Sequence, residues 1–257
     1  MRLRIAAISL LFLAACASQS TTPSPVKPDT SLLLLGEQHD EPAHHEQVRA
    51  MVQSLAGSGA LAALALEMAD SGATTAGLAP QATGDAVRRA LRWDGEGWPW
   101  ANYAPTVMAA VAAGVPVVGV NLERAKLRRA MTDAGLDAVL PGPAIKAQQQ
   151  AIREGHCGLL PESQIAPMTR MQIARDRHMA QTLAGLAVPG KTVLLIAGAG
   201  HVDPELGVPQ HLPRGLASKS VVLPAPVGPR RDDCEQLRRQ WQAGSVPDRG
   251  RDGRIPP

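Results

Sequence analysis

Ser31-Leu32-Leu33-Leu34-Leu35 runs into Gly36-Glu37-Gln38-His39-Asp40, and Thr192-Val193-Leu194-Leu195-Ile196 runs into Ala197-Gly198-Ala199-Gly200-His201. Short runs rich in Leu, Val and Ile, each closed by Gly, are typical of strands that are buried on both faces of a sheet. Residues 61–66 and 115–120 form two more runs of this kind. These four segments therefore predict the strands of a buried, mainly parallel sheet.

Each predicted strand is followed by polar side chains. Glu37 and His39 follow the first, Glu67 the second, and His201 the last, while Asn121 follows residues 115–120. Because ligands of open parallel sheets bind beyond the carboxyl ends of the strands, we expect Glu37, His39, Glu67 and His201 to surround one cleft. The alternative interpretation is that these polar residues simply begin loops. Two histidines and two acids at such positions favour a site.

Helical patterns separate the predicted strands, which implies crossover connections and an α/β fold. In residues 44–56, apolar side chains recur at spacings of three and four and form one stripe. The remaining predicted elements are helices at 85–92, 105–113, 123–134, 143–154 and 164–186, and a last strand at 220–223.

The N-terminus has the order of a secretory signal. Arg2 and Arg4 precede an apolar stretch that is too short for a permanent transmembrane helix, and Leu13-Ala14-Ala15 leads into Cys16. This end resembles the bacterial lipobox, in which the cysteine is diacylated and becomes the first residue of the mature chain. We expect a signal peptide over 1–15, a flexible Ser/Thr/Pro-rich tether over 16–30, and a lipid anchor in the outer membrane, facing the periplasm.

Removal of the signal leaves about 240 residues, enough for one α/β core with a subsidiary lobe. The formal net charge is only +3, so nothing indicates a nucleic-acid surface. Cys157 and Cys234 are the cysteines that remain besides Cys16. In an oxidising periplasm they predict a disulfide, which would pin the Arg/Gly/Pro-rich tail, residues 225–257, to the body.

Aromatic residues are concentrated in one segment. Apart from Phe12 in the signal and Trp241 in the tail, they all lie in Trp93-Asp94-Gly95-Glu96-Gly97-Trp98-Pro99-Trp100-Ala101-Asn102-Tyr103. Rigid flat side chains in a Gly/Pro loop suit a large planar or apolar ligand, or a partner surface. The alternative is that they cap a small hydrophobic lobe.

Several short motifs in order resemble the ChaN family of iron-regulated, haem-binding lipoproteins. They are Leu-Gly-Glu-Gln-His-Asp at 35–40 with His44-His45, Trp100-x-x-Tyr103-x-Pro105, Val-Asn at 120–121, Gln172-x-x-Arg175-Asp176-x-x-Met179-Ala180, and Gly198-x-x-His201. The resemblance covers residues 31–224. It implies a parallel sheet flanked by helices, a smaller helical lobe, and haem bound at a homodimer interface with a tyrosine-type axial ligand.

The resemblance makes Tyr103, the only tyrosine, the expected haem ligand. Further candidates for cofactor binding are Trp100, His44, His45, Arg175 and His178, with Arg175 also suited to neutralise a propionate. The chain has no Cys-x-x-Cys-His motif, so any haem is expected to be non-covalent. A purely structural role stays open for Tyr103, His44, His45 and His178. We therefore predict a lipid-anchored haem-binding protein that serves iron uptake.

Two alternatives remain open. The resemblance extends to Tiki-type, TraB-type and erythromycin-esterase-like proteins, which implies hydrolysis, with Glu37, His39, Glu67 and His201 as catalytic residues. Mixed imidazole and carboxylate donors, here His39, His201 and Glu67, would suit zinc or manganese. The third possibility is an envelope protein whose Trp-rich segment only docks a partner, its strand-end site being vestigial.

Overall fold

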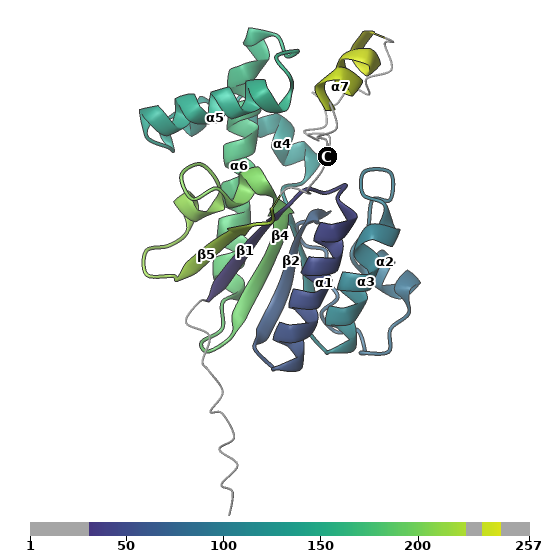
Figure 1. Cartoon of the computed structure of the whole chain (residues 1–257). Coiled ribbons are helices and arrows are strands. Elements are labelled where there is room, and N and C mark those ends of the chain that lie inside the picture. Colours follow the sequence, from purple (N-terminus) through teal and green to yellow (C-terminus); the bar gives the residue numbers. More distant parts are fainter. Residues whose placement is uncertain (1–30, 225–232, 243–257) are drawn as a thin grey trace, which may run out of the picture.

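Five parallel strands form one sheet in the computed structural model, which describes residues 31–224 and 233–242 (Figure 1). The strand order is β3-β2-β4-β1-β5. The elements are β1 (Leu32–Glu37), β2 (Leu61–Asp70), β3 (Val117–Asn121), β4 (Thr192–Gly198) and β5 (Ser218–Val222). The predicted α/β class with a mainly parallel sheet is confirmed. The predicted signal peptide, the tether and most of the predicted tail lie outside the described residues.

Two strands are longer than their apolar runs, and this moves site residues into the sheet. Glu37 is the last residue of β1, where it pairs in register with Gly198 of β4. Glu67 lies inside β2, which continues to Asp70 after a shift in its register with β3. Both carboxylates are therefore held by strand backbone, not by loops, and both are buried.

Helices cover both faces of the sheet (Figure 1). On one face α1 (Pro42–Gly57), α2 (Gly84–Ala90) and α3 (Trp100–Ala112) pack on a core that includes Leu64, Leu66 and Ile196. On the other face α6 (Glu162–Leu186) packs through Met179 and Leu183 against β1 and β4, together with η3 (Val208–His211). The sheet is thus enclosed on both sides, as its apolar strands require.

A smaller helical lobe lies beyond the carboxyl ends of the strands (Figure 1). It contains α4 (Arg124–Ala130), η1 (Ala134–Ala138), α5 (Gly142–Gly155) and the first half of α6, around a core that includes Leu127, Ile152 and Met168. The single helix predicted at 123–134 ends at Ala130, because Asp133 caps η1 by accepting a hydrogen bond from Gly135. No helix among the described residues is long and apolar enough to cross a membrane.

A disulfide joins Cys157, just after α5, to Cys234 in α7 (Asp233–Gln242), with the two Cα atoms 5.4 Å apart. This is the pair that the sequence predicts. The bond links the helical lobe to the C-terminal end of the chain and closes a loop of 77 residues.

The aromatic segment is not a loop throughout. Helix α3 begins at Trp100, five residues before the predicted start at Pro105, so Trp100 and Tyr103 are helical and Pro105 lies inside the helix. Trp93 packs edge-on to Trp100, with ring centroids 5.0 Å apart, and also contacts Tyr103. These mutual contacts give the first turn of α3 a hydrophobic anchor that periodicity alone does not reveal.

Candidate functional site

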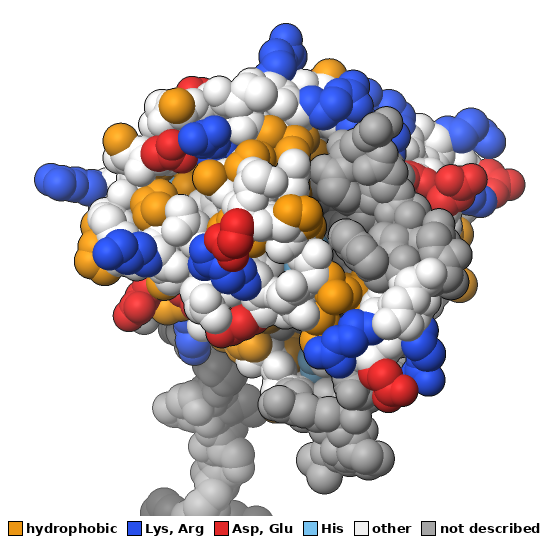
Figure 2. All heavy atoms as spheres, turned by 90° about the horizontal axis from the view of Figure 1, so that it is seen from above, with side chains coloured by type: hydrophobic (Ala, Val, Ile, Leu, Met, Phe, Trp, Pro, Cys, Tyr) orange, Lys and Arg blue, Asp and Glu red, His pale blue; other side chains and the backbone are white. Residues whose placement is uncertain are grey.

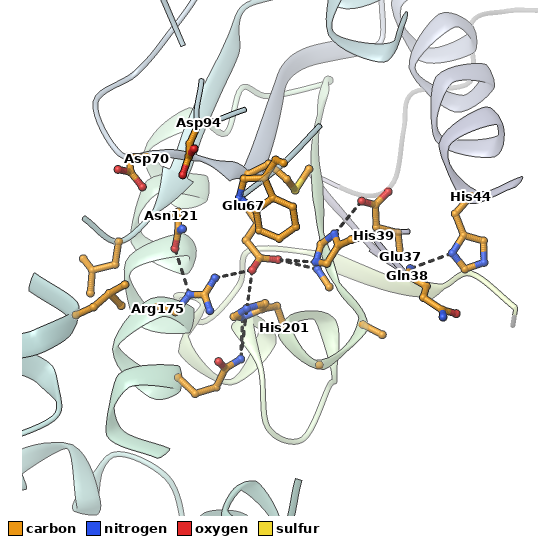
Figure 3. Close-up of a pocket in the computed structure, with 18 of the residues that line it drawn as sticks. Glu37, Gln38, His39, His44, Glu67, Asp70, Asp94, Asn121, Arg175 and His201 are labelled. Carbon is orange, nitrogen blue, oxygen red and sulfur yellow. Dashed lines mark hydrogen bonds and ion pairs between the residues drawn. The ribbon is translucent and has the colours of Figure 1, made fainter. Parts of the chain in front are cut away.

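A cavity of about 510 Å³ opens at the carboxyl ends of β1, β2, β3 and β4, beneath the helical lobe. Glu37, His39, Glu67 and His201 all line it. Figure 3 shows these side chains converging from different strands and from the short helix η2 (Ala199–Val202). The strand-end residues singled out from the sequence therefore meet in one place, together with Arg175 from α6.

Glu67 lies at the centre of this cluster. Arg175 Nη2 donates to its Oε1 at 2.5 Å, and the backbone N–H of Gly198 donates to its Oε2 at 2.8 Å. His201 Nε2 lies 3.2 Å from the same Oε1. Burial alone would raise the pKa of Glu67, but His201 and Arg175 hold it well below its usual range. Glu67 is therefore a fixed, buried negative charge.

His201 is held between two carboxylates. Its Nδ1 lies 2.5 Å from Asp176 Oδ1, opposite the contact with Glu67, and Gln172 Nε2 lies 3.1 Å from the same ring nitrogen. Burial lowers the pKa of His201, but Glu67 and Asp176 outweigh burial and raise it to about 9. His201 is thus a buried imidazolium at neutral pH. For Asp176 burial prevails over the pairing, so its pKa is raised.

Sequence reasoning did not assign roles to Asp176, Gln172 and Asn121. Arg175 Nε donates to Asn121 Oδ1 at 3.1 Å, which fixes the guanidinium against Glu67. The sequence does contain a pattern that could have identified the residues of α6, because residues three and four positions apart share one face of a helix. Gln172, Arg175 and Asp176 satisfy this spacing on α6, and all three are buried at the same end of the sheet.

A second group of contacts centres on His39. Its Nδ1 lies 3.0 Å from Glu37 Oε1, and Tyr103 Oη donates to that same oxygen at 3.0 Å. His39 Nε2 lies 3.6 Å from Glu67 Oε2, and the ring packs edge-on to Trp98 with centroids 4.7 Å apart. With Nδ1–H donated to Glu37, a neutral His39 keeps its lone pair on Nε2.

The His39 ring and the Glu67 carboxylate both lie close to the backbone of β4 at Gly198. A Cβ atom on Gly198 would lie 3.0 Å from His39 Nε2 and 3.7 Å from Glu67 Oε2. A side chain at this position would therefore press directly on the imidazole. The glycine that closes the apolar run of β4 is required by the site as well as by the strand.

Tyr103 is placed behind the site, not in it. Only 3% of the residue is exposed, it does not line the cavity, and its hydroxyl is committed to Glu37. Burial and the nearby Glu37 raise the pKa of Tyr103 above its ordinary value. In this conformation the phenol is neutral, whereas a tyrosine-type haem ligand binds as the phenolate. Its role here is to support Glu37 and, through it, His39.

Of the other residues predicted to bind a cofactor, His44 lines the cavity, whereas His45 and Trp100 do not. His44 lines the cavity but is fully engaged: the Gln38 N–H donates to Nδ1 at 2.9 Å, and Nε2 donates to Pro224 O at 2.9 Å. His45 Nε2 lies 3.0 Å from His39 O and so supports the site from outside. Trp100 packs on Trp93 and does not line the cavity.

His178 also lies away from the cavity. It faces a separate, shallower groove between α4 and α6. Arg175 and His178 are three residues apart on α6, yet the groups of side chains that they contact are different. Of these two candidates for cofactor binding, only Arg175 lines the strand-end cavity.

No group of three or more His, Cys, Asp or Glu side chains within residues 31–224 and 233–242 is arranged to hold a metal ion. Glu67 and His201, two of the three expected zinc or manganese ligands, instead form ion pairs with Arg175 and Asp176. The third, His39, contacts Glu67 through Nε2. The structure gives no support to this metal set.

The rest of the cavity combines apolar walls with cations. Trp98 faces it from the aromatic segment, and further apolar side chains line it, namely Met68, Leu122, Leu127, Val222 and Leu223. Arg92 and Arg124 lie at the end of the cavity that also contains Asp70 and Asp94. Burial raises the pKa of Asp70 although Arg92 opposes the effect. The site is thus amphipathic, with apolar walls between charged groups.

Comparison with known proteins agrees with this architecture. A family model described as "Haem-binding uptake, Tiki superfamily, ChaN" matches residues 28–212. A solved structure described as "Cofacial heme binding to ChaN of Campylobacter jejuni" is 25% identical, with a TM-score of 0.59, over 75% of this chain and 80% of that chain. No curated protein matches the sequence.

Proposed function

The chain belongs to the haem-binding uptake family of the Tiki superfamily, the ChaN family, and we propose that it binds haem non-covalently in the strand-end cavity. The observation that carries this proposal is the cavity itself, which has apolar walls, cationic groups and a histidine, His39, whose Nε2 makes no hydrogen bond to any described residue and lies 3.6 Å from Glu67 Oε2. The haem-binding ChaN of Campylobacter jejuni, which shares the fold, gives it further support.

The residues present fit the chemistry of haem. The volume of the strand-end cavity, about 510 Å³, falls within the range of roughly 300–1,000 Å³ that is usual for ligand pockets. Trp98 and the apolar side chains beside it suit a porphyrin face, while Arg92 and Arg124 are suited to propionate carboxylates. When bound, haem would supply an iron centre that takes a donor atom from the protein.

We propose that His39 Nε2 would hold the haem iron. Among the histidines that line the cavity, His44 and His201 have both ring nitrogens engaged by protein atoms within hydrogen-bond distance. His39 uses Nδ1 on Glu37, which is the carboxylate–histidine arrangement that orients metal-ligating imidazoles. Tyr103, the ligand implied by resemblance, would have to leave Glu37, come into the cavity and lose its proton.

We further propose that the mature chain is attached to the periplasmic face of the outer membrane through a diacylated Cys16 and serves iron uptake. The lipobox-like sequence before Cys16 supports the anchor, and the family description, a haem-binding uptake family, supports the role in iron uptake.

A homodimer that shares haem at its interface is also part of this proposal. The expected signature is a haem-dependent increase in mass, measured by light scattering on the non-acylated mature chain.

Haemin titration of the mature chain tests the proposal. We expect a saturable Soret shift in the wild type that His39→Ala strongly weakens. Tyr103→Phe should keep the same ligand spectrum with a modest loss of affinity, because it removes only the hydrogen bond to Glu37. His156→Ala, a histidine outside the cavity, is the matched control and should behave as wild type. An unchanged spectrum in His39→Ala would contradict the assignment of His39 as the iron ligand. The absence of a Soret shift in the wild type would contradict the proposal that the chain binds haem.

Hydrolysis by general-base catalysis is the second candidate function. The observation that favours it is the position of His39 between two carboxylates, 3.0 Å from Glu37 and 3.6 Å from Glu67, at the edge of a cavity that water can enter. A carboxylate partner makes an imidazole a stronger base. Turnover of simple nitrophenyl esters by haem-free wild type, lost in His39→Ala and kept in His156→Ala, would support it.

A further inference from the structure

A second depression lies on the helical lobe, between α4 and α6. This α4–α6 groove has a volume of about 380 Å³ and is separate from the strand-end cavity, although Leu122 lines both. Its apolar floor includes Leu122, Leu136 and Ala174. Its polar lining consists of Lys126, Arg129, Asp133, Arg177, His178 and Gln181. None of these polar residues takes part in the haem site proposed above.

The groove contains a buried nitrogen that lacks a hydrogen bond. Within the described part of the chain, His178 Nε2 has no partner and no accessible surface to speak of. Burial lowers the pKa of His178, and the adjacent Lys126 lowers it further, with Glu123 acting in the opposite direction. An imidazole nitrogen placed in this way is costly unless something donates to it or accepts from it. Because Nε2 has no accessible surface, a ligand in the groove reaches it only if the imidazole ring rotates towards the groove.

The charges around His178 are predominantly positive. Arg129 and Arg177 make no side-chain hydrogen bond or ion pair with any residue that the structure describes, and Lys126 has one half-exposed pair with Glu123 at 3.6 Å. Asp133 is the one acid in the groove lining, and it is used to cap η1. Three cations and one acid give the lining a net charge of +2, which matches a dianion.

Figure 2 looks onto the molecule from the side of the helical lobe and shows Lys and Arg side chains spread over this face, with hydrophobic side chains between them. Two arginines with unused guanidinium forks favour phosphate, because the planar fork can bind two phosphate oxygens at once. A phosphate monoester carries close to two negative charges at neutral pH. The apolar floor would contact the organic part of the ester.

We propose that the α4–α6 groove is an anion site for a small phosphate monoester, held by Arg129, Arg177 and Lys126, with the His178 ring in its lining. The site is independent of the haem cavity and works in the haem-free protein. Haem binding and phosphate binding can therefore succeed or fail separately.

The probes are inorganic phosphate and phenyl phosphate, added to the haem-free mature chain with its disulfide intact and with sodium chloride at matched ionic strength as the reference. Binding is followed by the ring resonances of His178 in long-range ¹H–¹⁵N spectra and by calorimetry. We expect saturable binding, tighter for phenyl phosphate because of the apolar floor. The pKa of His178 should rise on binding, since a dianion opposes both burial and Lys126. The other charged groups that face His178 are Arg129, Arg177, Asp133 and Glu123. They are the same in the phosphate-bound and the phosphate-free protein, so the change in the pKa of His178 reports on the added anion.

Three variants complete the test. Arg129→Gln and Arg177→Gln should each weaken phosphate binding about tenfold, the usual consequence of losing one charged hydrogen-bonding partner. Arg128→Gln is the matched control, because Arg128 is an exposed arginine of α4 that does not line the groove. The proposal is overturned if chloride reproduces the shifts of His178, or if Arg128→Gln weakens binding as much as the other two. Binding of phosphatidylglycerol vesicles through Arg129 and Arg177 without binding of the soluble phosphates would also overturn it, in favour of a membrane surface.

Discussion

Raising the pH from 6.5 to 9.5 should destabilise the protein through His201. The pKa of this residue is about 9 in the folded chain, against 6.5 for an unperturbed histidine. Between these values the folded chain holds a proton that the unfolded chain has lost, so the free energy of unfolding falls as the pH rises. The contribution of His201 is complete below pH 6.5 and disappears as the pH passes 9.

The magnitude follows from the width of this interval. A difference of about 2.5 pH units, at about 1.36 kcal/mol per unit, corresponds to a loss of about 3 kcal/mol. The physical source is the position of the imidazolium between Glu67 and Asp176, which outweighs the cost of burying it. This would be a large part of the net stability of about 5–15 kcal/mol that is typical of a protein domain.

Urea unfolding at half-unit pH intervals measures the effect, with tryptophan fluorescence as the probe and phosphate-free buffers throughout. Trp93, Trp98 and Trp100 report on the sheet and on α3. The diagnostic quantity is the slope of the unfolding free energy against pH. His201→Gln should flatten that slope whatever its effect on absolute stability, whereas His156→Gln should keep it. A wild-type slope of zero, or equal slopes in wild type and His201→Gln, would refute the reasoning.

Three further predictions concern the site and the disulfide. Gly198→Ala should weaken haemin binding, because the new methyl group lies against His39 Nε2 at 3.0 Å; unchanged affinity in a titration would contradict the geometry. Trp98→Ala should also weaken haemin binding without unfolding the protein, since Trp98 is only half-buried, and circular dichroism checks the fold beside the Soret titration. Replacing Cys157 and Cys234 by Ser opens a 77-residue loop and should cost on the order of 4 kcal/mol on the chain-entropy model; an unaltered urea midpoint would show that the bond contributes little.

The sequence alone was sufficient to establish the class of fold and the edge of the sheet at which the site lies. Four apolar runs closed by glycine predict buried parallel strands, because only strands covered on both faces can be apolar throughout. The polar residues that follow them had to meet at one edge, since parallel strands end together. Glu37, His39, Glu67 and His201 therefore converge as expected.

Only the tertiary structure decided what each of these residues can do. His201 becomes a buried cation because α6 places Asp176 against it, and that contact joins residues 25 positions apart. Tyr103 has the right chemistry for an iron ligand by its type, but α3 places its hydroxyl on Glu37, and Tyr103 itself does not line the cavity. Sequence specifies which donors are present, whereas burial and the partners on neighbouring elements determine their charge and where their lone pairs point.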